Sequence, residues 1–142
     1  MADDVVLNKT GAIERCLQRI REEYEDDPTN LRDDITKQDA IILNLQRACQ
    51  ATIDLAMHLV REHDLGVPQE SRDAFALLEE HGYLDPELSG RLMRMVGFRN
   101  VAVHEYQKLN LDIVQAIVEE HLSDFTQFTE RVLATDGFRS ED

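Results

Sequence analysis

One short stretch, residues 95–108 (MVGFRNVAVHEYQK), brings together four side chains that can take part in chemistry. Arg99, Asn100, His104 and Tyr106 lie within eight positions of a pattern that otherwise predicts a buried helix. Histidine titrates near neutral pH and can accept or donate a proton, while the planar guanidinium of arginine matches the oxygens of a phosphate or carboxylate. These residue types therefore predict an anion site at which a proton can be moved.

The charge balance supports an anion site in the same stretch. The whole chain has a formal net charge of −14. This excludes a protein that coats nucleic acid, because Lys and Arg supply most non-specific affinity for phosphates. Between residues 91 and 108 the charge balance reverses. This stretch has one acidic residue, Glu105, and four basic residues, Arg91, Arg94, Arg99 and Lys108. We expect the three cations other than Arg99 to contact phosphates of a bound substrate.

Helical spacing predicts how the four side chains are arranged. A single face carries residues three or four apart, namely Leu88, Leu92, Met95, Arg99, Val103 and Tyr106. Asn100 and His104 are four residues apart and fall on a neighbouring face. Arg99 should then be buried and need a partner. The alternative to a reactive site is an arginine paired with a carboxylate of another helix and a histidine bonded to a carbonyl.

The elements around this stretch are predicted to be five helices, with no alternating strand pattern. The first covers residues 5–24, and the second begins at residue 36 and ends at the sequence DLGVP (64–68). The third covers residues 71–82, the fourth runs from residue 85 into the stretch 95–108, and the fifth covers residues 111–132. Thr36 and Asp39 resemble a capping box, and Asp85 followed by Pro86 is typical of a helix start. The fold class is therefore all-α, an antiparallel bundle with short connections.

Length and composition fit one domain over residues 1–142. Cys16 and Cys49 each fall inside a helical pattern and are expected to be reduced, core-packed thiols. No apolar run approaches the ~18 residues of a membrane span, and the N-terminus lacks a signal-peptide pattern. We therefore expect a cytoplasmic protein with no membrane partner.

The sequence RNVAVHEY at 99–106 has the form Arg-x4-His-x-Tyr and resembles the signature of the HEPN superfamily. The tyrosine-bearing form is similar to HepT-type toxins, and so are the flanking segments ILNLQRA, GVPQESRDAFALLEE and LSGRLMRMVGFRNVAVHEYQKLNLDIV. The resemblance implies a five-helix HEPN-type bundle that dimerises. Residue by residue, Arg99, Asn100 and His104 match the catalytic positions, and Tyr106 matches the modified one.

The resemblance also implies a function. HepT proteins are metal-independent endoribonuclease toxins of toxin–antitoxin pairs. Their antitoxin is a minimal nucleotidyltransferase (MNT) that transfers AMP from ATP to the motif tyrosine. The expected partners are thus a second copy of the chain, an MNT antitoxin and an RNA substrate, with no cofactor.

The residues fit that chemistry. Cleavage of RNA without a metal needs a base for the 2′-hydroxyl, an acid for the 5′-oxygen and a cation for the phosphoryl oxygens. Histidine suits the first two tasks and arginine the third. One chain supplies one motif histidine, so our hypothesis is that a dimer brings two copies of His104 into one cleft.

Two other functions stay open at this point. A non-catalytic HEPN module would bind nucleotide or RNA beside a nucleotidyltransferase, with Arg99 and His104 holding phosphate without cleavage. A purely structural helical dimer would use neither. A metal site is not expected, because His58, Glu62 and His63 could contact an ion but no second cluster completes four ligands.

Overall fold

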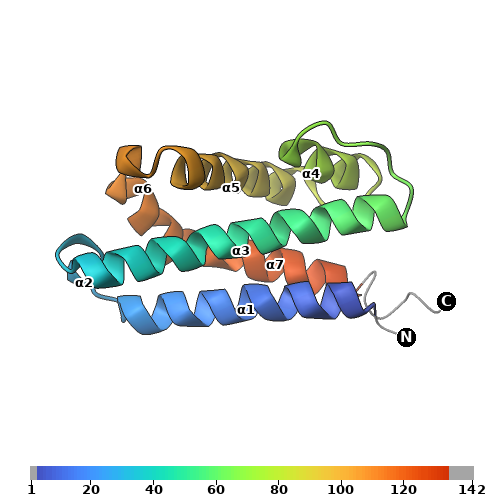
Figure 1. Ribbon diagram of the computed structural model, residues 1–142. Helices are drawn as coiled ribbons and strands as arrows, with labels where there is room; N and C mark the ends of the chain where they lie inside the picture. Colours follow the sequence, from blue (N-terminus) through green and yellow to red (C-terminus); the bar gives the residue numbers. More distant parts are fainter. Residues whose placement is uncertain (1–2, 135–142) are drawn as a thin grey trace.

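The computed structural model describes residues 3–134, and that part of the chain is helical with no strand (Figure 1). In chain order the elements are α1 (Asp4–Tyr24), α2 (Thr29–Arg32), α3 (Ile35–Glu62), α4 (Ser71–Glu80), α5 (Pro86–His104), the 3₁₀ turn η1 (Tyr106–Lys108), α6 (Leu111–Ala116), the π-helical turn η2 (Ile117–His121) and α7 (Leu122–Val132). The five predicted helices are present, the last as the continuous run α6–η2–α7. The short α2 was not predicted.

The long helices run up and down alongside one another, as predicted for an antiparallel bundle. In Figure 1, α3 crosses the molecule with α1 antiparallel on one side and α5 antiparallel on the other, while α7 returns behind them. The side chains that fill the space between helices include Leu17, Leu45, Phe75, Phe125 and Phe128, each at most 2 % exposed. Burial of large apolar side chains from every long helix holds α3 in the middle of the bundle.

Local sequence sets where α3 and α5 begin. Asp85 caps α5 by accepting a hydrogen bond from the Leu88 amide at 2.8 Å, and Pro86 occupies the first turn, as predicted. The predicted cap of α3 is wrong by two residues. Asp34 accepts from the Lys37 amide at 3.1 Å, which leaves Asp39 free to contact another element.

The face assigned to α5 is wrong beyond Met95. The buried side continues through Phe98 and Ala102, which are 7 % and 4 % exposed, whereas Val103 is 47 % exposed. A step of three or of four residues keeps a helical face, so both Phe98 and Arg99 were compatible with the spacing. The larger apolar side chain took the core position, and the arginine lies at its edge.

A second correction concerns the end of α5. The helix stops at His104, since Glu105 leaves the helical conformation at φ −142° and ψ 50°. Tyr106 therefore lies in the η1 turn rather than on the α5 face. The helical arithmetic that placed it two turns from Arg99 on one face does not apply.

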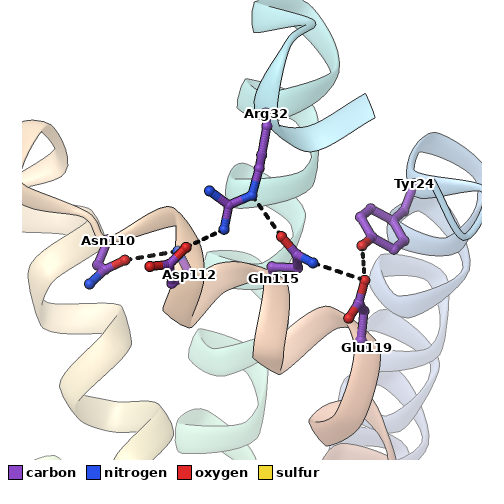
Figure 2. A network of polar contacts seen from close by, with 6 residues as sticks. All are labelled: Tyr24, Arg32, Asn110, Asp112, Gln115 and Glu119. Carbon is purple, nitrogen blue, oxygen red and sulfur yellow. Dashed lines mark hydrogen bonds and ion pairs between the residues drawn. The ribbon is translucent and has the colours of Figure 1, made fainter. Parts of the chain in front are cut away.

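A polar network fixes the segment that follows this turn (Figure 2). Arg32 of α2 donates from Nη2 to the Asp112 carboxylate and from Nε to Gln115 Oε1, the latter at 2.7 Å. Gln115 donates to Glu119 at 3.3 Å, and the Tyr24 hydroxyl of α1 also donates to Glu119. The network connects α6 and η2 to α2 and α1. The first residue of α6 lies three residues after the end of η1.

Candidate functional site

Arg99 is held by three neutral side chains from three helices. Its Nη1 donates to Gln50 Oε1 of α3 at 2.6 Å, its Nη2 to Ser71 Oγ of α4 at 3.1 Å, and its Nε to Asn100 Oδ1 at 2.9 Å. No carboxylate within residues 3–134 forms an ion pair with it. The predicted alternative of a buried arginine–carboxylate pair is therefore wrong. The guanidinium is fixed in position while its charge stays uncompensated.

The positive charge of Arg99 affects the pKa of a thiol in the core. Burial raises the pKa of the Cys49 thiol to about 12, and the nearby Arg99 opposes that rise. Cys49 is buried and Cys16 partly buried, and both are free thiols, as predicted. A thiol with such a raised pKa stays protonated, so Cys49 supplies packing rather than a nucleophile.

Asn100 and His104 lie on the exposed side of α5. The side-chain oxygen of Asn100 accepts a hydrogen bond from Arg99, and its amide nitrogen can donate to a ligand. His104 is exposed at the last position of the helix, and its ring makes no hydrogen bond or ion pair with the described residues. It is therefore open to a substrate or to a second protein chain.

Tyr106 is bound near the start of α3. Its hydroxyl donates to Asp39 Oδ1 at 2.5 Å, while the residue as a whole is 42 % exposed. Burial first, and then the hydrogen bond and negative charge of Asp39, raise the pKa of Tyr106 to about 12. The phenol is thus kept protonated at neutral pH.

The two contacts lie on one face of α3 but are well separated. Gln50 and Asp39 are eleven residues apart, which is three helical turns and about 16 Å. The hydrogen bond that holds Tyr106 is therefore three turns of α3 away from the one that holds Arg99. Tyr106 is instead two residues from His104, and both are exposed.

The predicted basic patch is partly neutralised. Arg91 pairs with the buried Asp124 at 2.9 Å and with Glu87 at 3.4 Å, and Lys108 pairs with Glu105 at 3.1 Å. Charge counting between residues 91 and 108 included Glu105 but missed Asp124 and Glu87, which lie outside that stretch. Arg94 is exposed and makes no ion pair with the described residues.

Two pockets flank α5. The first, of about 450 Å³, is lined by Glu70, Ser71, Arg72, Val96, Arg99 and Asn100. The second, of about 530 Å³, lies between α5 and α6, with an apolar wall that includes Phe98, Val101 and Ile113 and with Arg72, Arg91, Arg94 and Lys108 among its lining residues. Arg72 reaches both because Gly97 has no side chain: a Cβ there would lie 3.2 Å from Arg72 Nη2.

Arg72 is a cation that the sequence reasoning missed. It makes no hydrogen bond or ion pair with residues 3–134, so its guanidinium is available to an anion. A single sequence does not show that an arginine of α4 lies close to Gly97 of α5.

The site thus combines a cation held in place by hydrogen bonds, Arg99, with two exposed side chains. These are His104 at the end of α5 and Tyr106 in the turn that follows. The family model described as "Ribonuclease HepT-like" matches residues 13–132. The chain belongs to the HepT-like family. The resemblance in the Arg-x4-His-x-Tyr motif is thereby confirmed at the level of the family.

Relatives of this HepT-like chain agree with the fold. It is 48 % identical over 132 residues to the mRNA nuclease HepT of Shewanella oneidensis, covering 93 % of this chain and 98 % of that one. A structure of a toxin–antitoxin with AMP-PNP matches with a TM-score of 0.89 at 48 % identity, covering 93 % and 99 % of the two chains. A tri-AMPylated Shewanella oneidensis HEPN toxin in complex with MNT antitoxin matches with a TM-score of 0.88 at 48 % identity, covering 93 % and 98 %.

Two further predictions concern metal and membrane. The ligand atoms of Asp3, His58 and Glu62 lie within 4.8 Å of one another, with His58 Nε2 2.6 Å from Asp3 Oδ2. Asp3, rather than the expected His63, therefore accompanies His58 and Glu62, and His63 packs near Tyr83 instead. No described helix is long and apolar enough to cross a membrane.

Proposed function

We propose that this chain is the toxin of a toxin–antitoxin pair, an endoribonuclease that cuts RNA without a metal ion. The observation that carries the proposal is the state of Arg99. Three neutral oxygens hold its guanidinium at the wall of a pocket of about 450 Å³, and no carboxylate within residues 3–134 forms an ion pair with it. An arginine placed in this way is suited to stabilise charge on a phosphoryl group in the transition state.

The other two positions of the motif have separate roles. His104 transfers the proton, as the base toward the 2′-hydroxyl or as the acid toward the 5′-oxygen. Its ring is exposed and makes no hydrogen bond or ion pair with the part of the chain that the structure describes, so it can reach RNA or a second subunit. Asn100 orients Arg99 through its side-chain oxygen and offers its amide nitrogen to a phosphate oxygen.

The nuclease is a homodimer in this proposal, because one chain supplies one motif histidine and the reaction needs both an acid and a base. Mixing Arg99→Ala subunits with His104→Ala subunits tests whether the site is shared. Recovery of cleavage in the mixture is the expected result. Two inactive parents that stay inactive together would assign a complete site to each subunit.

We further propose that an MNT nucleotidyltransferase neutralises the toxin by transferring AMP to Tyr106. The hydroxyl lies at the surface, and the Shewanella relative is a tri-AMPylated toxin bound to an MNT antitoxin. Tyr106 is near His104 in the chain, and Asp39, which holds it, lies about 16 Å along α3 from Gln50, which holds Arg99. Added AMP would therefore obstruct RNA at the His104 end of the site.

Growth arrest in a bacterial host tests the nuclease. Expression of the chain should stop growth and degrade RNA, and His104→Ala should abolish both, since histidine is the residue type in the motif best suited to accept and donate a proton. His81→Ala is the matched control, because it removes an exposed histidine at the end of α4. Cleavage by purified protein should persist in a chelator. Arrest that survives His104→Ala would favour the non-catalytic HEPN module.

A further inference from the structure

The AMP acceptor is bound to a carboxylate of its own chain. The Tyr106 hydroxyl donates to Asp39 Oδ1 at 2.5 Å across a separation of 67 residues, from the η1 turn to the first turns of α3. Asp39 is not needed to cap α3, because Asp34 does so. Within residues 3–134, the Asp39 side chain accepts its hydrogen bond from the Tyr106 hydroxyl.

This arrangement has the geometry of a nucleophile and its base. A hydroxyl becomes a better nucleophile when an adjacent group within hydrogen-bond reach accepts its proton as it attacks. An aspartate with an ordinary pKa near 4 is ionised at neutral pH and can take that proton. An isolated phenol, in contrast, ionises only near pH 10 and is a poor nucleophile at pH 7.

We propose that Asp39 positions the Tyr106 hydroxyl and accepts its proton when AMP is transferred to it. The inference rests on the proposed function, and it assigns part of the transfer chemistry to the toxin. The toxin would then contribute a base to its own inactivation, while the nucleotidyltransferase supplies ATP.

The step balances as follows. Tyr106 Oη attacks the α-phosphorus of ATP held by the nucleotidyltransferase, and the Oη–P bond forms. The bond from that phosphorus to the bridging oxygen of the β-phosphate breaks, and pyrophosphate leaves with the electron pair. The phenolic proton moves to Asp39 Oδ1. No oxidant or reductant takes part.

The surroundings of the pair favour this use over a purely structural one. Tyr106 is 42 % exposed, so a second protein can approach the oxygen from the side away from α3. Burial, and then the hydrogen bond and charge of Asp39, raise the pKa of Tyr106 to about 12, so direct ionisation of the free hydroxyl is suppressed. Proton transfer to Asp39 during attack avoids that cost.

The test is the rate of AMP transfer in Asp39 variants. Full-length chain would be incubated with the partner nucleotidyltransferase, ATP and Mg²⁺, and AMP followed by intact mass. Because general base catalysis contributes roughly 10²–10⁴-fold, Asp39→Asn should lower the turnover number by about 100-fold with the KM for ATP unchanged. Asp39→Glu should recover much of the rate. Asp33→Asn, an exposed aspartate that loses the same charge nearby, should behave as wild type.

The pH profile separates a base from a structural contact. Wild type should transfer AMP at a nearly constant rate between about pH 6 and 8, because a carboxylate within hydrogen-bond distance takes the phenolic proton during attack. Asp39→Asn should gain roughly tenfold per pH unit toward the phenol pKa, since hydroxide must then remove the proton. Its own phenol pKa should fall from about 12, because the carboxylate that raises it is gone.

Three outcomes decide the matter. Asp39→Asn with the rate and pH profile of wild type would overturn the role of Asp39, and so would a failure of Asp39→Glu to recover activity in folded protein. Melting temperatures show whether each variant is folded, which the exposed position of Asp39 favours. If wild type gains no AMP that Tyr106→Phe removes, the proposed neutralisation fails and this inference with it.

Discussion

Two polar contacts with α3 differ in what they do to the side chain they hold. At Gln50, Arg99 is fixed by neutral oxygens from three helices, and its positive charge is left for a ligand. At Asp39, Tyr106 is held by one carboxylate, and its proton stays in place. The first contact prepares a cation, and the second prepares a hydroxyl. In the proposed function, one face of α3 therefore supports a cleavage residue and a modified residue through Gln50 and Asp39, which are about 16 Å apart.

The structural surroundings of Arg99 and Tyr106 also differ. Arg99 lies in the middle of α5, packed beside the core residue Phe98. Tyr106 lies in a three-residue 3₁₀ turn between two helices, where no residue of the turn is buried. We therefore expect substitutions at the Arg99 end to change RNA cleavage and substitutions at the Tyr106 end to change AMP transfer.

The largest expected effect is at Arg99 itself. Arg99→Lys keeps the charge but loses the planar fork that binds Gln50, Ser71 and Asn100 together, and RNA cleavage should fall by about 10²–10³-fold. AMP transfer to Tyr106 should stay near the wild-type rate, because the two contacts are three turns apart on α3. Turnover of a labelled RNA and intact mass measure the two activities on the same samples. A parallel loss of both would show that the two ends act as one site.

An intermediate effect is expected at Arg72, which lines the pocket of Arg99 and has no protein partner among the described residues. Arg72→Ala should raise the KM for RNA several-fold with little change in turnover, and should reduce the slope of log affinity against log salt by about 1. Arg19→Ala, which removes an exposed arginine of α1, is the matched control. A change in turnover without a change in salt slope would contradict a phosphate contact.

Much of this comparison could not be obtained from the sequence. The five main helical segments and the start of α5 at Asp85 followed from spacing and capping chemistry, and the motif from a resemblance, because each depends on residues close together in the chain. The edge position of Arg99 did not follow, since Phe98 and Arg99 fitted the helical period equally well. The contacts of Tyr106 with Asp39 and of Arg99 with Gln50 join residues 67 and 49 positions apart, and periodicity carries no information about them.

The smallest expected effect tests whether the Tyr106 end depends on the network of Figure 2. Arg32→Gln removes the ion pair with Asp112, whose side chain is 79 % exposed, and exposed pairs contribute only about 0–1 kcal/mol. The melting temperature should therefore fall slightly. Because α6 follows η1 directly, AMP transfer should slow a few-fold while RNA cleavage is unchanged. Lys9→Gln, which removes the exposed pair with Asp54 on the α1–α3 side, should lower stability to a similar extent without slowing transfer. Equal transfer rates in the two variants would show that the turn holds Tyr106 against Asp39 without the help of α2.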